Sequence, residues 1–262
     1  MRPLRLLLVY LAAVFLGGAI LAPWLYFAFH PVLPRQPFHR FLDRSLLGLA
    51  LVGLWPLLRS LGMKSWRELG LVNLKSRGPD FAIGIFIGSL TILAALAVTM
   101  IAGVRLPQFH FDKLANATVA AAIVSFLEEL LFRGALFGLL RRTFDWRLAA
   151  LLSSLIYAAG HFLHKADLAG QITWLSGLQL LPAMFQDFTV ARFINLTLVG
   201  CSLAVAYQRT GALYCSMALH GAWIFWIQTL ASDNMLDGWN MTPLLAGAIL
   251  LVIGWAPAKS NA

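Results

Sequence analysis

Long uncharged apolar stretches recur along the chain. Four of them come close to or exceed the roughly 20 residues that cross a bilayer as a helix, and they lie at residues 6–29, 81–104, 212–232 and 241–258. Three shorter stretches, at 45–58, 148–164 and 193–208, predict further spans. In the first of these, Arg44 and Arg59 must extend to the two interfaces. An eighth segment, 114–140, has the length of a span but carries charges near its middle.

This pattern predicts an all-α fold, a polytopic transmembrane helix bundle of about eight spans that forms a single domain over 1–262. Residues 168–186 are uncharged but broken by Gly170, Gly177 and Pro182, which predicts a re-entrant or interfacial piece rather than a ninth span. Gly211 follows residues 193–208 closely and can adopt a left-handed cap, so the helices on either side are expected to be antiparallel neighbours.

Composition places the chain in a membrane. Its 262 residues are 60% hydrophobic and only 12% charged, and the mean hydropathy is +0.78, which excludes soluble enzymes and nucleic-acid binders. The net charge of +9 therefore indicates loop Lys and Arg that contact anionic membrane lipids. Counted in alternate loops, these residues number twelve against seven, which predicts a multi-pass protein of the cytoplasmic (inner) membrane with both termini in the cytoplasm. Cys201 and Cys215 lie in apolar runs and indicate no disulfide framework.

Segment 114–140 contains three charges that need an explanation. A charged side chain at a helix centre costs about 2.5 to 3.5 kcal/mol on insertion scales, unless it faces the interior and pairs. Glu129 and Arg133 are four residues apart, in the favourable order for an ion pair on one helix face. Glu128 is rotated from Glu129 by about 100°. It therefore needs a partner from another helix and suits a general base.

Two histidines in other apolar stretches supply such partners. His161 and His220 belong to separate predicted spans, and imidazole can orient water, bind a metal or donate to an oxyanion. Glu128, His161 and His220 also match the ligand set of some hydrolytic zinc sites. A divalent metal such as zinc is therefore one alternative, although no His-Glu-x-x-His motif is present. A metal-free site, which we favour slightly, works equally well. A purely structural ion pair of Glu129 with Arg133 stays open, as does an interfacial place for His164.

Three short motifs carry a family resemblance. Residues 128–133, Glu-Glu-Leu-Leu-Phe-Arg, resemble the Glu-Glu-x-x-x-Arg motif of the CPBP intramembrane proteases, which include CAAX prenyl endopeptidases and bacteriocin-processing or self-immunity proteins. Tyr157 and His161 are similar to the family's aromatic-x-x-x-His motif. His220 begins a segment similar to His-x-x-x-Asn or His-x-x-x-Asp, but Ile224 stands where the family has the amide or acid.

The resemblance, which covers about 114–228, implies roles for the matching residues. Glu128 would be the general base, His161 would help to bind or activate the water, and Glu129 and Arg133 would support them. His220 would hold the oxyanion. Ile224 has no donor, so the resemblance leaves one donor missing, which Trp223 or Asn195 could replace.

We therefore predict an intramembrane endopeptidase in which Glu and His activate a water in a cavity between membrane helices. Its partners would be membrane lipids and a peptide or protein substrate, which can be membrane-anchored, and no nucleic acid. The alternatives are a non-catalytic membrane immunity or scaffold protein, and a small proton-coupled carrier that uses Glu128 as a relay. The carrier is disfavoured because the sequence has no inverted repeats.

Overall fold

The structure is a computed structural model that describes residues 2–101, 103, 106–162, 170–183 and 188–230. In these residues the chain is helical, and it has no strand. The principal elements, in chain order, are α1 (Arg2–Phe29), α2 (Phe38–Ser60), α3 (Gly78–Ile101), α4 (Leu114–Glu129), the π-helical η4 (Leu130–Phe137), α5 (Gly138–Leu140), α6 (Trp146–Gly160), α7 (Ser176–Ala183), α8 (Val190–Thr210) and α9 (Tyr214–Leu230). Three short 3₁₀ turns are η1 (Trp66–Leu69), η2 (Leu74–Arg77) and η3 (Phe111–Lys113).

Seven of the eight predicted spans fall on these helices, and the eighth, 241–258, lies outside the described residues. Within the described part, four segments are long and apolar enough to cross a membrane, namely Leu4–Phe29, Phe38–Ser60, Trp66–Val98 and Val190–Thr210. The second is longer than the sequence predicted, because the helix continues through the polar residues that precede Ser45. These findings support the all-α membrane bundle.

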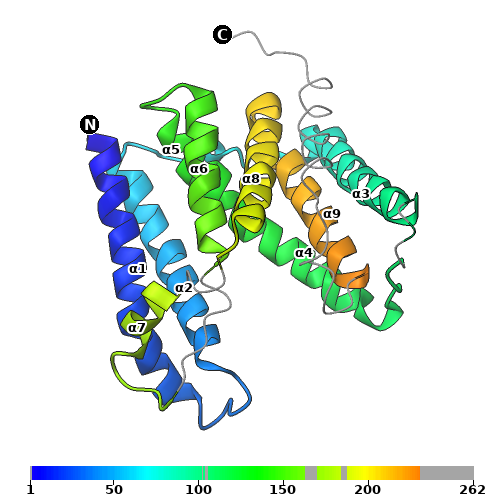
Figure 1. The fold of residues 1–262 in the computed structure, drawn as a ribbon. Helices are drawn as coiled ribbons and strands as arrows, with labels where there is room; N and C mark the ends of the chain where they lie inside the picture. The colour runs from blue at the N-terminus through cyan, green and yellow to red at the C-terminus, as the bar shows by residue number, and fades with distance from the viewer. Residues whose placement is uncertain (1, 102, 104–105, 163–169, 184–187, 231–262) are drawn as a thin grey trace.

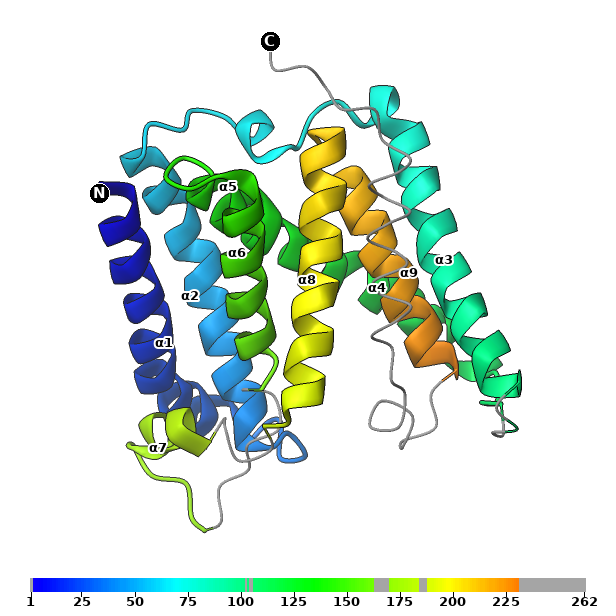
Figure 2. The same ribbon diagram turned by 45° about the horizontal axis from the view of Figure 1, so that its top comes forward.

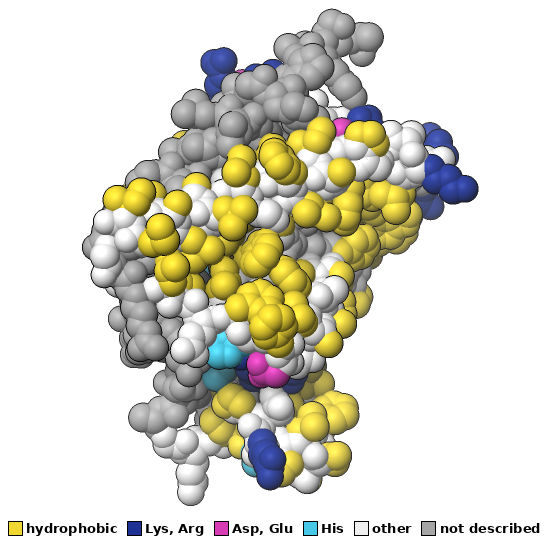
Figure 3. All heavy atoms as spheres, turned by 90° about the vertical axis from the view of Figure 1, so that its right-hand side faces the viewer, with side chains coloured by type: hydrophobic (Ala, Val, Ile, Leu, Met, Phe, Trp, Pro, Cys, Tyr) yellow, Lys and Arg dark blue, Asp and Glu magenta, His cyan; other side chains and the backbone are white. Residues whose placement is uncertain are grey.

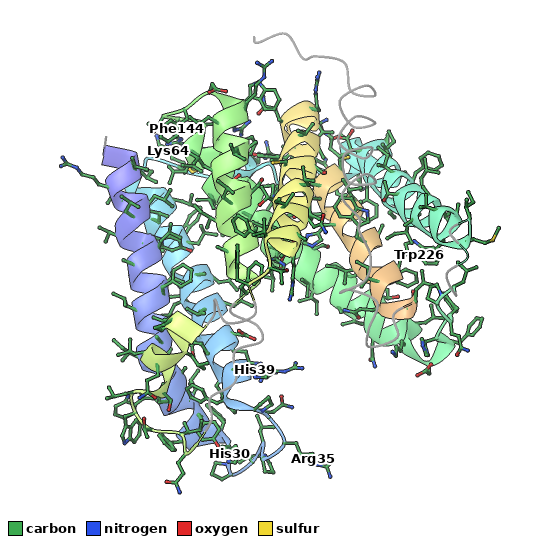
Figure 4. The ribbon with its side chains drawn as sticks, viewed as in Figure 1. His30, Arg35, His39, Lys64, Phe144 and Trp226 are labelled. Carbon is green, nitrogen blue, oxygen red and sulfur yellow. The ribbon has the colours of Figure 1, made fainter. Side chains whose placement is uncertain are left out.

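The helices run between two ends of the molecule (Figure 1). The turns that carry Lys64 and Phe144 lie at one end, and His30 and Arg35 lie at the other (Figure 4). Helix α4 crosses behind α8 and α9 at a steep angle, while α6 and α8 stand side by side (Figures 1 and 2). The predicted antiparallel pair is present, since Gly211 caps α8 in the left-handed region with φ +68° and α9 turns back.

Two glycines allow α3 to pack closely against α9. A Cβ on Gly84 would meet the backbone of Cys215, and a Cβ on Gly88 would lie 2.7 Å from that of Ala222. Two indole N–H groups donate across the same interface, from Trp223 to Thr91 Oγ1 at 2.8 Å and from Trp226 to Ser89 Oγ at 2.9 Å; Trp226 is labelled in Figure 4. Small residues and interhelical hydrogen bonds are the usual means of helix association in membranes. We call this interface the α3–α9 seam.

On the side of the molecule opposite the α3–α9 seam, α1 and α2 pack together as a pair, and α7 packs against α1. Gly18 lies against Leu46, which brings the two long helices together. Gly177 of α7 sits on the carbonyl of Ala19, and Trp24 packs on Trp174 with ring centroids 4.8 Å apart. A helix of eight residues is only about 12 Å long, so α7 cannot span. The prediction of a short re-entrant or interfacial piece in this region is consistent with this helix.

The turns between α2 and α3 are bound to the helices that they cross. The N–H of Leu213 donates to the carbonyl of Gly70 at 3.1 Å, and the Tyr214 hydroxyl donates to the carbonyl of Val72 at 2.6 Å. Gly70 adopts φ +87°, a conformation that other residues rarely accept. Gly134 of η4 lies against Leu69, so this connection packs directly on the π-helical segment.

The outer face of α3 and α4 is apolar. Hydrophobic side chains are spread over much of the described surface when the molecule is viewed from this side (Figure 3). They include Phe86 at 64% exposure and Leu93 at 55% on α3, and Val119 at 57% on α4. Such a continuous exposed apolar face is typical of helices that contact lipid.

Candidate active site

The segment with the unexplained charges is one continuous helix whose hydrogen bonding changes at its centre. The first part, α4, ends at Glu129, and the next eight residues, Leu130–Phe137, are π-helical. The continuity of 114–140 was predicted, but the π-helical hydrogen bonding was not, since it leaves no periodic signal in so short a stretch. Such segments are frequent at functional sites. Here the change follows directly after the two adjacent carboxylates.

Glu129 and Arg133 form the ion pair that their spacing predicts. Arg133 Nη1 lies 3.0 Å from Glu129 Oε1, and the two side chains are 2% and 0% exposed. Arg133 Nη2 also donates to the carbonyl of Gly200 on α8 at 3.3 Å. Its guanidinium lies over the Tyr157 ring, 4.5 Å from the centroid. The arginine therefore connects α4, α6 and α8 at the centre of the bundle.

Glu129 has a second partner that the sequence did not reveal. His220 Nδ1 on α9 lies 3.0 Å from the same Oε1 atom. A carboxylate that is ionised only accepts hydrogen bonds, so Nδ1 is the donor. The only local signal is Gly221, where a Cβ would lie 3.3 Å from Ser125 Oγ. This small residue allows α9 to approach α4, and the carboxylate thus fixes the orientation of the His220 ring.

Glu128 faces the other ring nitrogens of both histidines. Its Oε2 lies 3.8 Å from His220 Nε2 and 4.0 Å from His161 Nε2. His161 Nδ1 lies 2.9 Å from the carbonyl of Tyr157. Because a carbonyl can only accept, Nδ1 carries the proton, and Nε2 of a neutral ring is then a hydrogen-bond acceptor. The three residues predicted from separate helices therefore converge on one point.

Helix α6 ends earlier than the sequence predicted. The expected span reached residue 164, but the last helical residue is Gly160 and His161 is the C-cap. The N–H groups of His161 and Phe162 bond to the carbonyls of Ala158 and Ala159, so the helix tightens in its last turn and stops. This ending turns the His161 ring toward α4. His164 lies outside the described residues, so its predicted interfacial position stays a prediction.

The distances at Glu128 leave space for a small molecule. Separations of 3.8 and 4.0 Å exceed a direct hydrogen bond and suit a bridging water. Oε2 is buried and makes no hydrogen bond within the described part of the chain. In the same part, no group of three or more His, Cys, Asp or Glu side chains has an arrangement suited to holding a metal ion. The donor types at the site nevertheless include those that bind zinc.

The three residues open onto a large cavity. It has a volume of about 1160 Å³ and is lined by α1, α2, α4, η4, α5, α6, α8 and α9. Its walls are mostly apolar, with Leu11 and Leu47 on the side of the α1–α2 pair and Leu131 on η4. A cavity of this kind with a few converging polar groups is typical of a ligand site.

The structure separates the two candidates for the missing donor. Trp223 lines the cavity, but its indole N–H is bonded to Thr91, so it does not replace the amide. Asn195 also lines the cavity and remains a candidate. Ile224 lies on the cavity wall one turn after His220, so this position faces the space in which an Asn would act.

Comparison with known proteins agrees with the motifs. Residues 110–226 match the model of a family described as Rce1-like, type II CAAX prenyl endopeptidase Rce1-like. The match contains Glu128, Glu129, Arg133, His161 and His220, and it begins after α3. No curated protein and no solved structure matches the chain.

Proposed function

Because residues 110–226 place the chain in the CPBP family of CAAX-type intramembrane proteases, we propose that it hydrolyses a peptide bond with a water activated by Glu128. The observation that carries this proposal is the position of Glu128 Oε2, buried at the edge of a large cavity and facing Nε2 of both His161 and His220. In a purely structural contact the groups would be expected to bond one another directly, as Glu129 does with Arg133 and His220.

Glu128 acts as the general base. A water between Oε2 and His161 Nε2 would donate to both, since each is an acceptor when His161 is protonated on Nδ1. Proton transfer from this water to Glu128 produces the hydroxide equivalent that attacks the peptide carbonyl. The same proton then passes to the leaving amine, which restores the carboxylate.

His220 stabilises the oxyanion that forms in this attack. Its Nδ1 donates to Glu129, so a proton taken up on Nε2 makes the ring a donor toward the cavity, with the positive charge balanced by Glu129. Glu129 and Arg133 do not touch the substrate in this mechanism. They hold His220 and the three helices in position, as an Asp orients the catalytic His of a serine protease.

The substrate is a protein or peptide in a membrane environment. The family description names a prenyl endopeptidase, and the apolar walls of the 1160 Å³ cavity suit a peptide that carries a lipid or a membrane anchor. We therefore propose a C-terminal CAAX-type protein as the substrate class. A non-catalytic immunity or scaffold protein and a proton-coupled carrier are the competing functions.

Mapping of peptide termini across the proteome tests the function and names the substrate. Cells that carry the wild-type protein are compared with cells that carry Glu128→Ala, at equal protein level in the membrane. We expect a set of C-terminal products that disappears in the variant. Identical termini in the two strains would favour a non-catalytic protein.

We propose that catalysis needs no metal ion. If Glu128, His161 and His220 bound zinc, the metal would polarise the water, and a strong chelator would abolish activity. We expect full activity of the purified protein after treatment with 1,10-phenanthroline, and no stoichiometric metal in elemental analysis. Loss of activity that added zinc restores would assign the three residues to a metal instead.

We also propose that the end with Lys64 and Phe144 faces the cytoplasm, as the Lys and Arg distribution predicts. Single cysteines at Trp146 and Arg209, both at this end, should react with a membrane-impermeant maleimide only after permeabilisation. Labelling of intact cells at both positions would reverse the orientation, and labelling at Arg209 alone would contradict the predicted span count around 168–186.

A further inference from the structure

One face of α8 forms a wall of the cavity and carries a cation. The residues of this helix that line the cavity are Ala191, Arg192, Asn195, Leu196 and Val199, which follow the spacing of a single helical face. Arg192 belongs to the first turn, since α8 begins at Val190. Asn195 and Val199 continue the same face toward Gly200, whose carbonyl accepts from Arg133. The face thus leads from Arg192 to the centre of the site.

Arg192 packs on the aromatic residue that follows His161 in the chain. Its guanidinium is 5.3 Å from the centroid of the Phe162 ring, and Phe162 is the neighbour of His161 in the chain. A guanidinium that stacks on an aromatic ring keeps the edge of its plane, with the N–H groups, available for hydrogen bonds. Arg192 therefore presents a planar set of donors within the cavity that contains Glu128.

Arg192 has no anionic partner in the described part of the chain. No hydrogen bond or ion pair joins Arg192 to another described residue, and Glu128 on the wall of the same cavity faces the two histidines. Arg133, by contrast, forms an ion pair with Glu129. A charged group in apolar surroundings is costly unless it pairs. The first turn of α8 contains no acidic residue, and Thr189 provides no side-chain cap.

We propose that Arg192 binds the free C-terminal carboxylate of the peptide substrate. This inference rests on the proposed function and deepens it, because it explains how the site would distinguish the end of a chain from an internal segment. The planar guanidinium matches a carboxylate with two parallel hydrogen bonds. Arg192 is then a specificity-determining residue, and Glu128, His161 and His220 act on a peptide bond near the bound chain end.

Binding in the absence of cleavage tests the proposal. The probe is a farnesylated peptide that ends in Cys-Val-Ile-Met, prepared as the free acid and as the C-terminal amide, and bound to Glu128→Gln protein in phosphatidylcholine nanodiscs. We expect the acid to bind about 10- to 100-fold more tightly than the amide, because a hydrogen bond to a charged group is typically worth that much. Adding Arg192→Gln should remove the difference, and Arg192→Lys should keep part of it.

Arg147 provides a matched control. Its guanidinium also stacks on an aromatic ring, 5.6 Å from the centroid of Trp146, but it is exposed and does not line the cavity. Arg147→Gln should leave the preference for the acid unchanged. Thermal unfolding by tryptophan fluorescence verifies that each variant is folded.

Three results would overturn the inference: equal binding of acid and amide, loss of the preference in Arg147→Gln, and competition by phosphatidylglycerol, which would assign Arg192 to a lipid headgroup. The proposed function is judged separately, by cleavage with wild-type Glu128. A protein that prefers the acid but never cleaves would retain the carboxylate site and lose the protease mechanism. A protein that cleaves the acid and the amide equally would retain the protease mechanism and lose the carboxylate site.

Discussion

The helices on the two sides of the candidate site are packed in opposite ways. At the α3–α9 seam, Gly84 and Gly88 bring the backbones together, and two indole N–H groups are bonded across the interface. On the side of the α1–α2 pair, the helices instead leave a cavity of about 1160 Å³. The membrane bundle is thus tight where it supports the site and open where a substrate would enter it.

Glu128 and Glu129 are adjacent in the chain, but one lies on the open side and the other on the packed side. Glu129 is fully buried between Arg133 and His220, while the Glu128 side chain is 25% exposed and lines the cavity. Adjacent positions on a helix point about 100° apart, so one acid is directed into the packed interior and the other into the open space. Hydropathy alone does not distinguish two such neighbours. Their different surroundings suit one to a structural role and the other to chemistry.

Breaking the packed side at its charged centre should have the largest effect. Glu129→Ala leaves Arg133 buried without its carboxylate and His220 without its acceptor. Removal of one partner of a buried pair costs about 3 to 5 kcal/mol, so we expect lower folded yield, a lower melting temperature in detergent and loss of cleavage. A melting temperature equal to that of wild type would refute the structural role of Glu129.

A donor added on the open side should increase the rate. Ile224 lines the cavity one turn after His220, so the amide of Ile224→Asn would point into it. One oxyanion donor typically changes kcat by a factor of about 10² to 10³. We expect kcat of Ile224→Asn to exceed that of wild type by a factor near the lower end of this range. If kcat does not change and Asn195→Ala lowers it instead, Asn195 already supplies the donor.

Expansion of the seam should destabilise the protein more moderately. Gly84→Leu forces side-chain atoms against Cys215 and Ala218, and overpacking typically costs about 1 to 3 kcal/mol. Gly48→Leu on α2 is the matched control, because a Cβ there meets nothing within 4 Å. Thermal unfolding should separate the two variants. Equal melting temperatures would mean that α3 and α9 are not tightly packed.

Partial filling of the cavity should have the smallest effect and leave stability unchanged. Leu11 of α1 lines the cavity, whereas Leu8 on the same helix is 58% exposed on the outer face. Leu11→Trp should raise KM about tenfold by removing space for the substrate, with little change in kcat. Leu8→Trp should leave both constants as they are. The same KM for both variants would argue against a substrate site between α2 and η4.

Much of this organisation follows from the sequence. Uncharged stretches predict the helices because a bilayer fixes their length, and the spacing of Glu129 and Arg133 predicts their ion pair. Each of Glu128, His161 and His220 places a polar side chain inside a separate membrane span, which is energetically costly. This cost indicates that the three side chains lie close together in the fold. The family resemblance agrees with the match at residues 110–226.

Other features depend on contacts between distant segments, which periodicity does not encode. The bond between His220 Nδ1 and Glu129 joins α9 to α4, and the use of the Trp223 donor by Thr91 joins α9 to α3. The early end of α6 at Gly160 is instead a local feature, a tightened last turn, which hydropathy does not reveal because the apolar residues continue to Phe162. The cavity itself arises from the distance between helix pairs, and no local pattern reports that distance.

The central claim is that Glu128 activates the water that cleaves the substrate. The most direct measurement is cleavage of the farnesylated peptide by purified protein in nanodiscs, followed by mass spectrometry, for wild type and Glu128→Gln. The account predicts release of the C-terminal fragment by wild type and no detectable release by Glu128→Gln, with equal melting temperatures, because the amide cannot accept the proton. Equal cleavage by the two folded proteins would contradict it.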